Sequence, residues 1–401
     1  MRDALKVMDR HIDGTYDKAL LLIMLLLLAF GALMIYSSTA VITPLLAKKK
    51  ITEFYYFKRH LFTMGLGSFA LLAAYRMKPA FLKKISVPLL VFSFVLLLLV
   101  FLPYIGVTAG GARRWIRLWP TTFQPSELVK LAMVIFLAKY MAAADYNTER
   151  ISSFVKPMLV MALFQVVFLK QPDFGATMSL GLLTFGMLYI SGMRLRYLAS
   201  VLVLVIPVIY KLVMEPYRLR RITSFLDPWK DPQGSGFQLI QSFISIGSGG
   251  ISGLGLGESK QKLSFLPASH TDFIFCLVGE ELGLIGAGLV IALFLMLFLR
   301  GVTVANRSRD SFNYYLAYGL TMMLSLQALI NFAVVTGLVP TKGLPLPFMS
   351  YGGSALLVNM AVIGLLLRIS KGDEEAVGED TRVIIAKKIA KRNIYGRKGY
   401  R

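Results

Sequence analysis

The sequence has little of what soluble, disulfide-bonded or nucleic-acid-binding proteins contain. Its one cysteine, Cys276, cannot form a disulfide within the chain. Charged residues make up only 16% of its 401 residues, whereas hydrophobic residues make up 56%. That composition excludes an ordinary soluble domain. The sequence also shows no internal repeat and no nucleic-acid recognition motif, so we expect no nucleic-acid partner.

Acidic residues are scarce as well. The chain has 22 Asp and Glu residues against 44 Lys and Arg residues, which gives a net charge of +22. Two interpretations stay open: the basic residues contact anionic membrane lipid, or some of them bind an anionic substrate. The second applies best to the basic residues expected on the outer side of the membrane, which are Arg113, Arg114, Arg117, Arg218, Arg220 and Arg221.

Long apolar runs recur along nearly the whole chain. Many are close to the roughly 20 residues that cross the hydrocarbon of a bilayer. Ala19–Tyr36 follows a charged segment without a small-residue cleavage site, so we expect a retained span and not a signal peptide. Hydropathy thus predicts an all-α polytopic membrane protein with about ten transmembrane helices. The expected spans are 19–40, 60–75, 85–103, 126–143, 155–170, 174–192, 197–214, 272–299, 313–337 and 350–368.

An even number of spans places both termini on one side of the membrane. The basic C-terminal tail indicates that this side is the cytoplasm, although Lys48–Lys50 in the first outer loop run against the positive-inside rule. We therefore expect a cytoplasmic N-terminal tail (1–18), a transmembrane domain (19–370) and a basic cytoplasmic tail (371–401).

One large extracytoplasmic loop, 215–271, is expected between helices 7 and 8. It is rich in apolar residues, and Phe237–Ile244 has the pattern of a short amphipathic helix at the membrane interface. A cluster of glycines follows and predicts tight turns. Long structured loops usually serve a function.

The stretch from His270 to Gly283 carries the strongest sign of chemistry. Asp272 lies where this polar loop enters an apolar span, and Glu280 and Glu281 follow within the span. Ionisable groups there are costly unless they are solvated, paired or used. Asp272 is therefore a candidate catalytic carboxylate, with helix capping as the alternative.

A second motif, residues 111–130, brings basic and acidic side chains together. Pro125 suits the first turn of a helix, and Glu127 and Lys130 then lie within reach on one helix face. They form either a structural ion pair or a charged pair facing an outer cavity. Upstream, Arg113 and Arg114 are candidate phosphate ligands, whereas Trp115 suits either a substrate contact or an interfacial anchor.

Three further polar positions allow two interpretations each. Asp173 caps the helix after a tight turn or serves the site, and Asn331 joins helices or binds a ligand. Lys342 lies in a rigid loop, 340–354, rich in Pro and Gly, and is a surface lysine or a phosphate ligand.

These motifs resemble the SEDS family (shape, elongation, division and sporulation) over about Asp17–Arg368. The resemblance is carried by GARRWIRL, FQPSELVKL, QPDFGAT, HTDFIFCLVGEELG and GLVPTKGLPLPFMSYGGS, and GLGESKQKLSFLP and VPTKG are most like the division branch, FtsW. The resemblance implies a peptidoglycan glycosyltransferase that polymerises lipid II, an undecaprenyl-diphosphate-linked precursor, for septal cell-wall synthesis. It implies catalytic roles for Asp272, Glu127 and Lys130. The expected substrate-binding residues are Arg113, Arg114, Trp115, Arg220, Arg221, His270, Lys342 and Ser350.

The implied chemistry suits these residue types. Asp272 would take the proton of the attacking sugar hydroxyl as general base, and cationic groups would stabilise the diphosphate leaving group. No resident metal site is expected, although a divalent cation (Mg²⁺ or Mn²⁺) could accompany the diphosphate.

The resemblance also implies a class B penicillin-binding protein and other divisome proteins as partners. The expected location is the bacterial cytoplasmic membrane at the division septum. The alternatives are a lipid II flippase, which would need alternating access, and a division scaffold without chemistry of its own.

Overall fold

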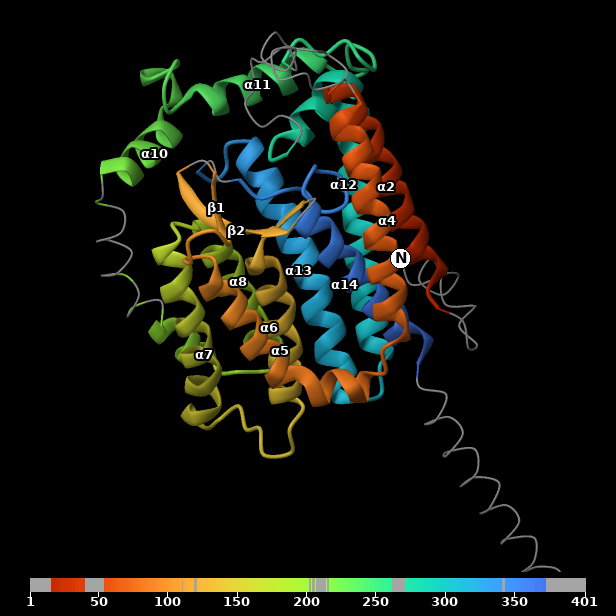
Figure 1. The fold of residues 1–401 in the computed structure, drawn as a ribbon, viewed down its shortest axis with the longest axis vertical. Coiled ribbons are helices and arrows are strands. Elements are labelled where there is room, and N and C mark those ends of the chain that lie inside the picture. Colours follow the sequence, from red (N-terminus) through yellow and green to blue (C-terminus); the bar gives the residue numbers. More distant parts are fainter. Residues whose placement is uncertain are drawn as a thin grey trace, which may run out of the picture.

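The computed structural model describes residues 16–39, 54–109, 111–118, 121–201, 203, 206, 214, 216–261, 271–340 and 343–372. Within these residues, six helices are long and apolar enough to cross a membrane, and they match predicted spans. The expected seventh span, 197–214, lies mostly outside the described residues, as do both tails. The long helices (Figure 1) are α2 Lys18–Thr39, α4 Tyr55–Arg76, α5 Pro79–Leu99, α6 Pro125–Met141, α7 Ile151–Lys170, α8 Phe174–Ile190, α12 Ile274–Arg307, α13 Ser311–Val335 and α14 Gly353–Lys371.

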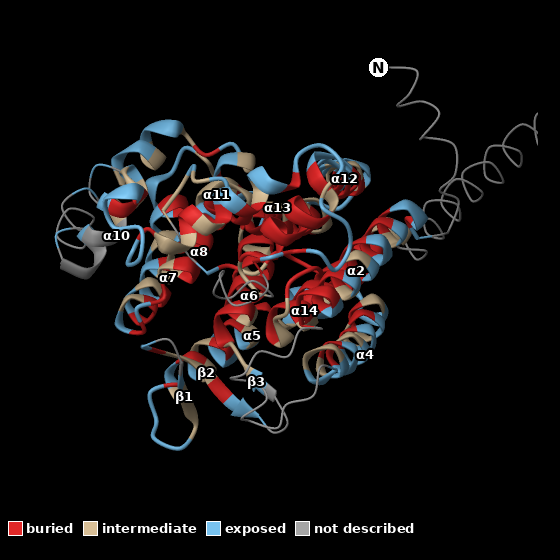
Figure 2. Cartoon of the chain, turned by 90° about the horizontal axis from the view of Figure 1, so that it is seen from above, coloured by how far each residue is buried: buried red, intermediate tan, exposed pale blue. Residues whose placement is uncertain are grey.

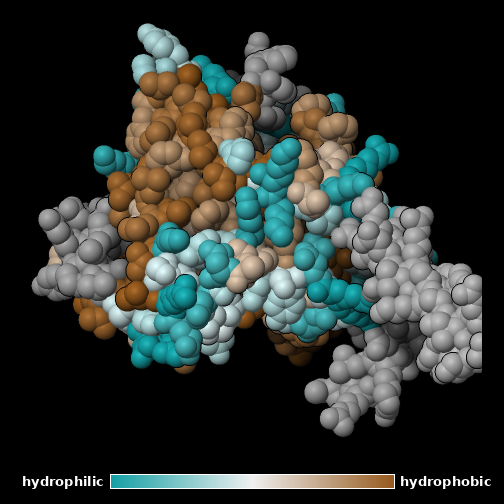
Figure 3. Space-filling view, turned by 90° about the horizontal axis from the view of Figure 1, so that it is seen from below, coloured by the Kyte–Doolittle hydropathy of each residue, from teal (hydrophilic) through white to brown (hydrophobic). Residues whose placement is uncertain are grey.

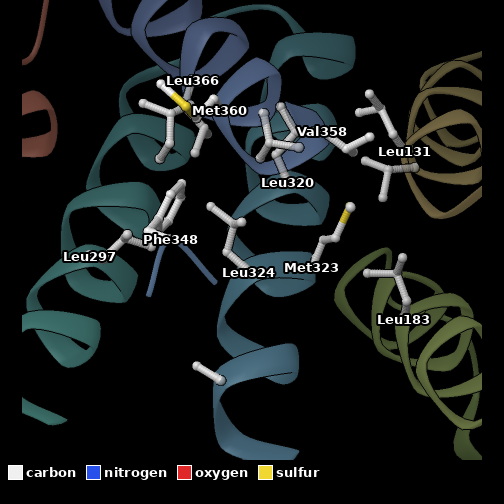
Figure 4. Packing of buried hydrophobic residues seen from close by; sticks show 14 of the residues in the cluster. Leu131, Leu183, Leu297, Leu320, Met323, Leu324, Phe348, Val358, Met360 and Leu366 are labelled. Carbon is white, nitrogen blue, oxygen red and sulfur yellow. The ribbon is translucent and has the colours of Figure 1, made fainter. Parts of the chain in front are cut away.

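Helices α6, α13 and α14 make up the centre of the bundle. Figure 2 shows their residues mostly buried, whereas α4 and α7 expose one side. Leu131 of α6, Leu320 and Met323 of α13, and Val358 of α14 pack in this core (Figure 4). Since lipid is as apolar as these side chains, van der Waals contact and interhelical hydrogen bonds hold such helices together. Polar residues in this core are therefore the ones that can supply the interhelical hydrogen bonds.

A small antiparallel sheet lies between α5 and α6 and was not expected in an all-α protein. Its strands are β1 Gly106–Ala109, β2 Ala112–Leu118 and β3 Thr121–Phe123. Val107 pairs with Trp115 and Thr108 with Arg113, so Arg114 is left without a partner on β1. Such a bulge changes the direction in which a side chain points, and here that side chain belongs to Arg114.

The large loop contributes helices α10 (Pro216–Leu226) and α11 (Phe237–Gly249) and a short 3₁₀ turn, Pro228–Lys230. Figure 1 shows α10 and α11 arching over one end of the bundle, above the strands. Helix α11 confirms the helix predicted there and buries Leu239 and Ile240.

Helix α12 is broken at Gly283, whose φ of 64° is open to glycine but costly for other residues. Residues Gly250–Gly255 lie beside this break and bond to α12 on both sides of it. The amides of Leu254 and Gly255 donate to the carbonyls of Glu280 and Glu281, both at 3.0 Å. The loop therefore satisfies backbone groups that the broken helix leaves free.

The two glutamates of α12 have the partners that their depth requires. Glu280 accepts hydrogen bonds from Ser259 Oγ (2.6 Å) and from the Lys260 amide (2.9 Å). Glu281 accepts one from Ser37 Oγ on α2 (2.6 Å). Both carboxylates are thus structural links between the loop, α2 and α12.

The opposite end of the bundle carries the connection between α6 and α7. Seen from below, hydrophilic side chains gather across the middle of this face and apolar ones flank them (Figure 3). Nearby, Arg300 of α12 donates through Nε to Asp17 Oδ2 at 3.1 Å. The Asp17 amide donates to Ser370 Oγ of α14 at 2.9 Å, which ties three helices together.

Candidate active site

Asp272 lies in the turn that leads into α12. Its side chain packs against Gly343, where an added Cβ would come within 2.2 Å of Asp272 Oδ2. Phe273 occupies the cap position of α12 and no side chain bonds the first turn, so the alternative in which Asp272 caps the helix is wrong. Among the described residues, the carboxylate therefore does not serve to cap α12.

The surroundings of Asp272 favour a proton acceptor. Burial raises the pKa of Asp272 to about 6, and the positive charge of Arg114 acts in the opposite direction. A carboxylate with that pKa is ionised near neutral pH yet binds a proton more readily than an exposed one. This is the balance that general base catalysis needs.

Arg114 connects the bulged strand with the turn between α7 and α8. Its guanidinium donates to the Pro172 carbonyl and lies 3.9 Å from Asp173 Oδ1. Asp173 caps α8 by accepting from the Ala176 amide at 3.2 Å, which confirms the capping interpretation. Arg114 is thus fixed by one acidic turn while its charge reaches Asp272.

Glu127 and Lys130 form the predicted ion pair at the start of α6. Lys130 Nζ lies 2.9 Å from Glu127 Oε1, and each side chain is 3% exposed. Pro125 occupies the first turn, as predicted. Glu127 Oε2 has no hydrogen-bond partner among the described residues, so it is an acceptor left open in a buried place.

The other predicted substrate ligands are less closely gathered. Arg113 is partly exposed and donates to the Phe101 carbonyl at 3.0 Å. Trp115 is half-buried on β2. Ser350 is 3% exposed, and its Oγ accepts from the Leu346 amide at 2.8 Å, so this hydroxyl braces a loop.

The side chains of four predicted ligands lie outside the described part of the structure. His270 and Lys342 lie outside the described residues. Arg220 and Arg221 lie on α10, the helix arching over the strands, and only their backbone is described.

Two amide side chains of α13 complete the arrangement. Asn331 bonds the Asp272 turn and the loop at Leu344, so it joins a turn and a loop to α13 and does not join one helix to another through these bonds. Gln327 bonds both Lys130 and that loop. Sequence reasoning did not single out Gln327, although a polar residue one turn before Asn331 in an apolar span was the available signal.

A resident metal centre has no ready set of ligands in the described part of the chain. No three His, Cys, Asp or Glu side chains come together there in a metal-binding group.

Comparison with known proteins identifies the family of this chain. A family model described as "Cell cycle protein", for FtsW, RodA and SpoVE, matches residues 17–375. The chain is 45% identical over 360 residues to the probable peptidoglycan glycosyltransferase FtsW of Geobacter metallireducens, covering 88% of this chain and 94% of that protein. It is 38% identical over 357 residues to stage V sporulation protein E of Bacillus subtilis, covering 88% and 97%.

Solved structures are similar along the same length. One solved structure is described as the structural coordination of polymerization and crosslinking by a peptidoglycan synthase complex. It matches with a TM-score of 0.74 at 29% identity, covering 89% of this chain and 98% of that one. RodA of Thermus thermophilus matches with a TM-score of 0.65 at 25% identity, covering 89% and 97%. The chain is therefore a multi-pass membrane protein that belongs to the FtsW, RodA and SpoVE family of cell cycle proteins, the SEDS family that its motifs resemble.

Proposed function

We propose that this protein is a peptidoglycan glycosyltransferase that polymerises lipid II into glycan strands for cell division, with Asp272 as general base. Family membership and relatives named for that activity support the reaction class. The observation that carries the assignment of the base is the buried Asp272 carboxylate, with its raised pKa, beside the positive charge of Arg114.

In this reaction a sugar hydroxyl of the acceptor attacks the anomeric carbon of the donor. The new glycosidic bond forms as the bond to the diphosphate oxygen breaks, and Asp272 takes the hydroxyl proton. Diphosphate leaves as an anion and needs no proton. One carboxylate therefore suffices, unlike the two that glycoside hydrolysis uses.

Charge on the departing diphosphate needs cationic partners. Arg114 is the described candidate whose charge acts on Asp272. Arg113 on the same strand, Lys342 and the arginines of α10 are further candidates. A divalent cation, if one came with the diphosphate, would supply additional charge stabilisation, and Asp272 is the carboxylate that would help to hold it. The Glu127–Lys130 pair would keep a buried lysine charged near the site.

The partner is proposed to be a class B penicillin-binding protein, acting with other divisome proteins. A similar solved structure is titled as a synthase complex that couples polymerization with crosslinking. The proposed location is the cytoplasmic membrane at the division septum. Lipid II translocation remains the alternative. The carboxylates of Glu280 and Glu281 in α12 do not favour translocation, because they already accept bonds from Ser37, Ser259 and Lys260.

The decisive experiment is polymerisation of labelled lipid II in detergent by the purified protein with its partner. Wild-type protein should yield glycan polymer and Asp272→Ala should yield none. Polymer from Asp272→Ala at the wild-type rate would remove Asp272 from the chemistry. Absence of polymer from the wild-type complex, together with lipid II transfer across vesicles, would favour the flippase.

A further inference from the structure

Asn331 bonds two separate segments with one amide group. It is 2% exposed in α13. Its Nδ2 donates to the backbone carbonyl of Asp272 and to that of Leu344, each at 2.8 Å. The two protons of one NH₂ group suffice for these two bonds. The turn of the candidate base is therefore fixed relative to the loop that packs on its carboxylate.

Gln327 lies one helical turn earlier, on the same face of α13. It is also 2% exposed. Its Oε1 accepts from Lys130 Nζ at 3.3 Å, and its Nε2 donates to the Pro345 carbonyl at 2.8 Å. A carboxamide can accept from a lysine and donate to a carbonyl at once, whereas an ionised carboxylate can only accept.

The two amides meet at consecutive carbonyls. Asn331 holds that of Leu344 and Gln327 holds that of Pro345. A continuous set of contacts thus runs from Lys130 of α6, through α13 and this loop, to Asp272. The two α13 side chains in this set, Gln327 and Asn331, are uncharged, so the linkage adds no charge beside the site.

We propose that Gln327 and Asn331 are positioning residues that set the Asp272 carboxylate and the Glu127–Lys130 pair in one fixed arrangement. The inference rests on the proposed role of Asp272 in glycosyl transfer. It predicts that loss of either amide reduces turnover more than substrate binding, because a small displacement of a catalytic group is costly to the reaction itself.

The first test replaces Asn331 with leucine, which has a similar shape and no donor. We expect kcat for lipid II polymerisation to fall by about 10- to 100-fold, with KM changed less than about threefold. Asn359→Leu is the matched control, because Asn359 is a fully buried asparagine of α14 whose amide atoms have no partner among the described residues. Its kcat should stay near wild type. Asn331→Ser, too short to reach both carbonyls, replaces Asn331→Leu if that variant does not fold.

The second test measures the linkage without activity. Hydrogen exchange should quicken at both 271–273 and 343–352 in Asn331→Leu and stay unchanged at both in Asn359→Leu. Faster exchange at both segments supports the linkage even if the wild-type protein does not polymerise lipid II, which would reject the proposed function alone. Unchanged exchange at either segment overturns the linkage, whatever the activity.

The third test uses the two bonds of Gln327. Gln327→Glu keeps the acceptor for Lys130 and loses the donor to Pro345, whereas Gln327→Met loses both. We expect the kcat of Gln327→Glu to lie between those of wild type and Gln327→Met. Since both amides hold one loop, Gln327→Met combined with Asn331→Leu should lower kcat by less than the product of the single effects. Multiplicative effects would mean that the two amides act independently, and would overturn the shared arrangement.

Discussion

Lys130 Nζ lies 2.9 Å from Glu127 Oε1 across one turn of α6, and both side chains are almost fully buried. Removing one partner of such a pair leaves an uncompensated buried charge. We expect Glu127→Gln and Lys130→Met each to lower the free energy of unfolding by about 3–5 kcal/mol and to reduce polymerisation.

The double variant tests whether the two residues act together. A double-mutant cycle on thermal unfolding should give a coupling energy of about 0.5–3 kcal/mol, with the double variant more stable than the sum of single losses implies. Additive losses would show that the pair contributes nothing as a pair.

Asp272→Asn should abolish glycan polymerisation and leave folding intact. The substitution keeps the size of the side chain and removes its ability to take a proton. Labelled lipid II measures the first effect and the thermal midpoint the second. Asp310→Asn is a suitable control, because the Asp310 side chain caps α13 by accepting from the Asn313 amide at 3.2 Å, a role that asparagine also fills. Equal loss from both variants would argue against a special role of Asp272.

Polymerisation should depend on pH with an acid limb near pH 6. Asp272 must be ionised to accept a proton, so activity should be lost as the pH falls through its pKa of about 6. Arg114→Gln removes a charge that lowers this pKa, and the midpoint should therefore move to higher pH. Arg117→Gln, at an exposed position of β2, should leave it in place. A midpoint unmoved by Arg114→Gln would contradict the electrostatic contact.

Gly283→Ala should destabilise the protein by about 1–3 kcal/mol, because a β-carbon is strained at this φ. The new Cβ would also lie 2.4 Å from the Gly253 amide nitrogen. Gly288→Ala serves for comparison, since a Cβ there meets nothing within 4 Å. Thermal unfolding measures both. Equal midpoints for the two variants would show that the break in α12 tolerates a side chain.

The helices could be predicted from sequence because the bilayer requires long apolar runs. The Glu127–Lys130 pair followed from helical spacing, and the Asp173 cap from a tight turn before an apolar run. Both depend on residues that are neighbours in the chain. The sheet was missed because its strands have at most seven residues, with Gly and Pro around them and no clear alternation.

Contacts between distant segments could not be predicted. Ser37, 244 residues from Glu281, reads as an ordinary polar residue near the end of an apolar run. Ser350 was expected to bind substrate, whereas its Oγ accepts a local bond from the Leu346 amide, and the sequence does not specify the loop path that brings the two together. Which carbonyls Asn331 would reach was decided by the loop at Leu344, and nothing local specifies that loop's path.

The break at Gly283 has a consequence for synthesis of the chain. Backbone groups around the break bond to Gly250–Gly255, which precede α12 in the sequence and so leave the ribosome first. In the topology expected from the sequence, the segment that completes its hydrogen bonding has already crossed the membrane when α12 enters the bilayer. The first half of α12 therefore depends on a loop that is made before it, and a delay in placing that loop would leave the carbonyls of Glu280 and Glu281 without their partners.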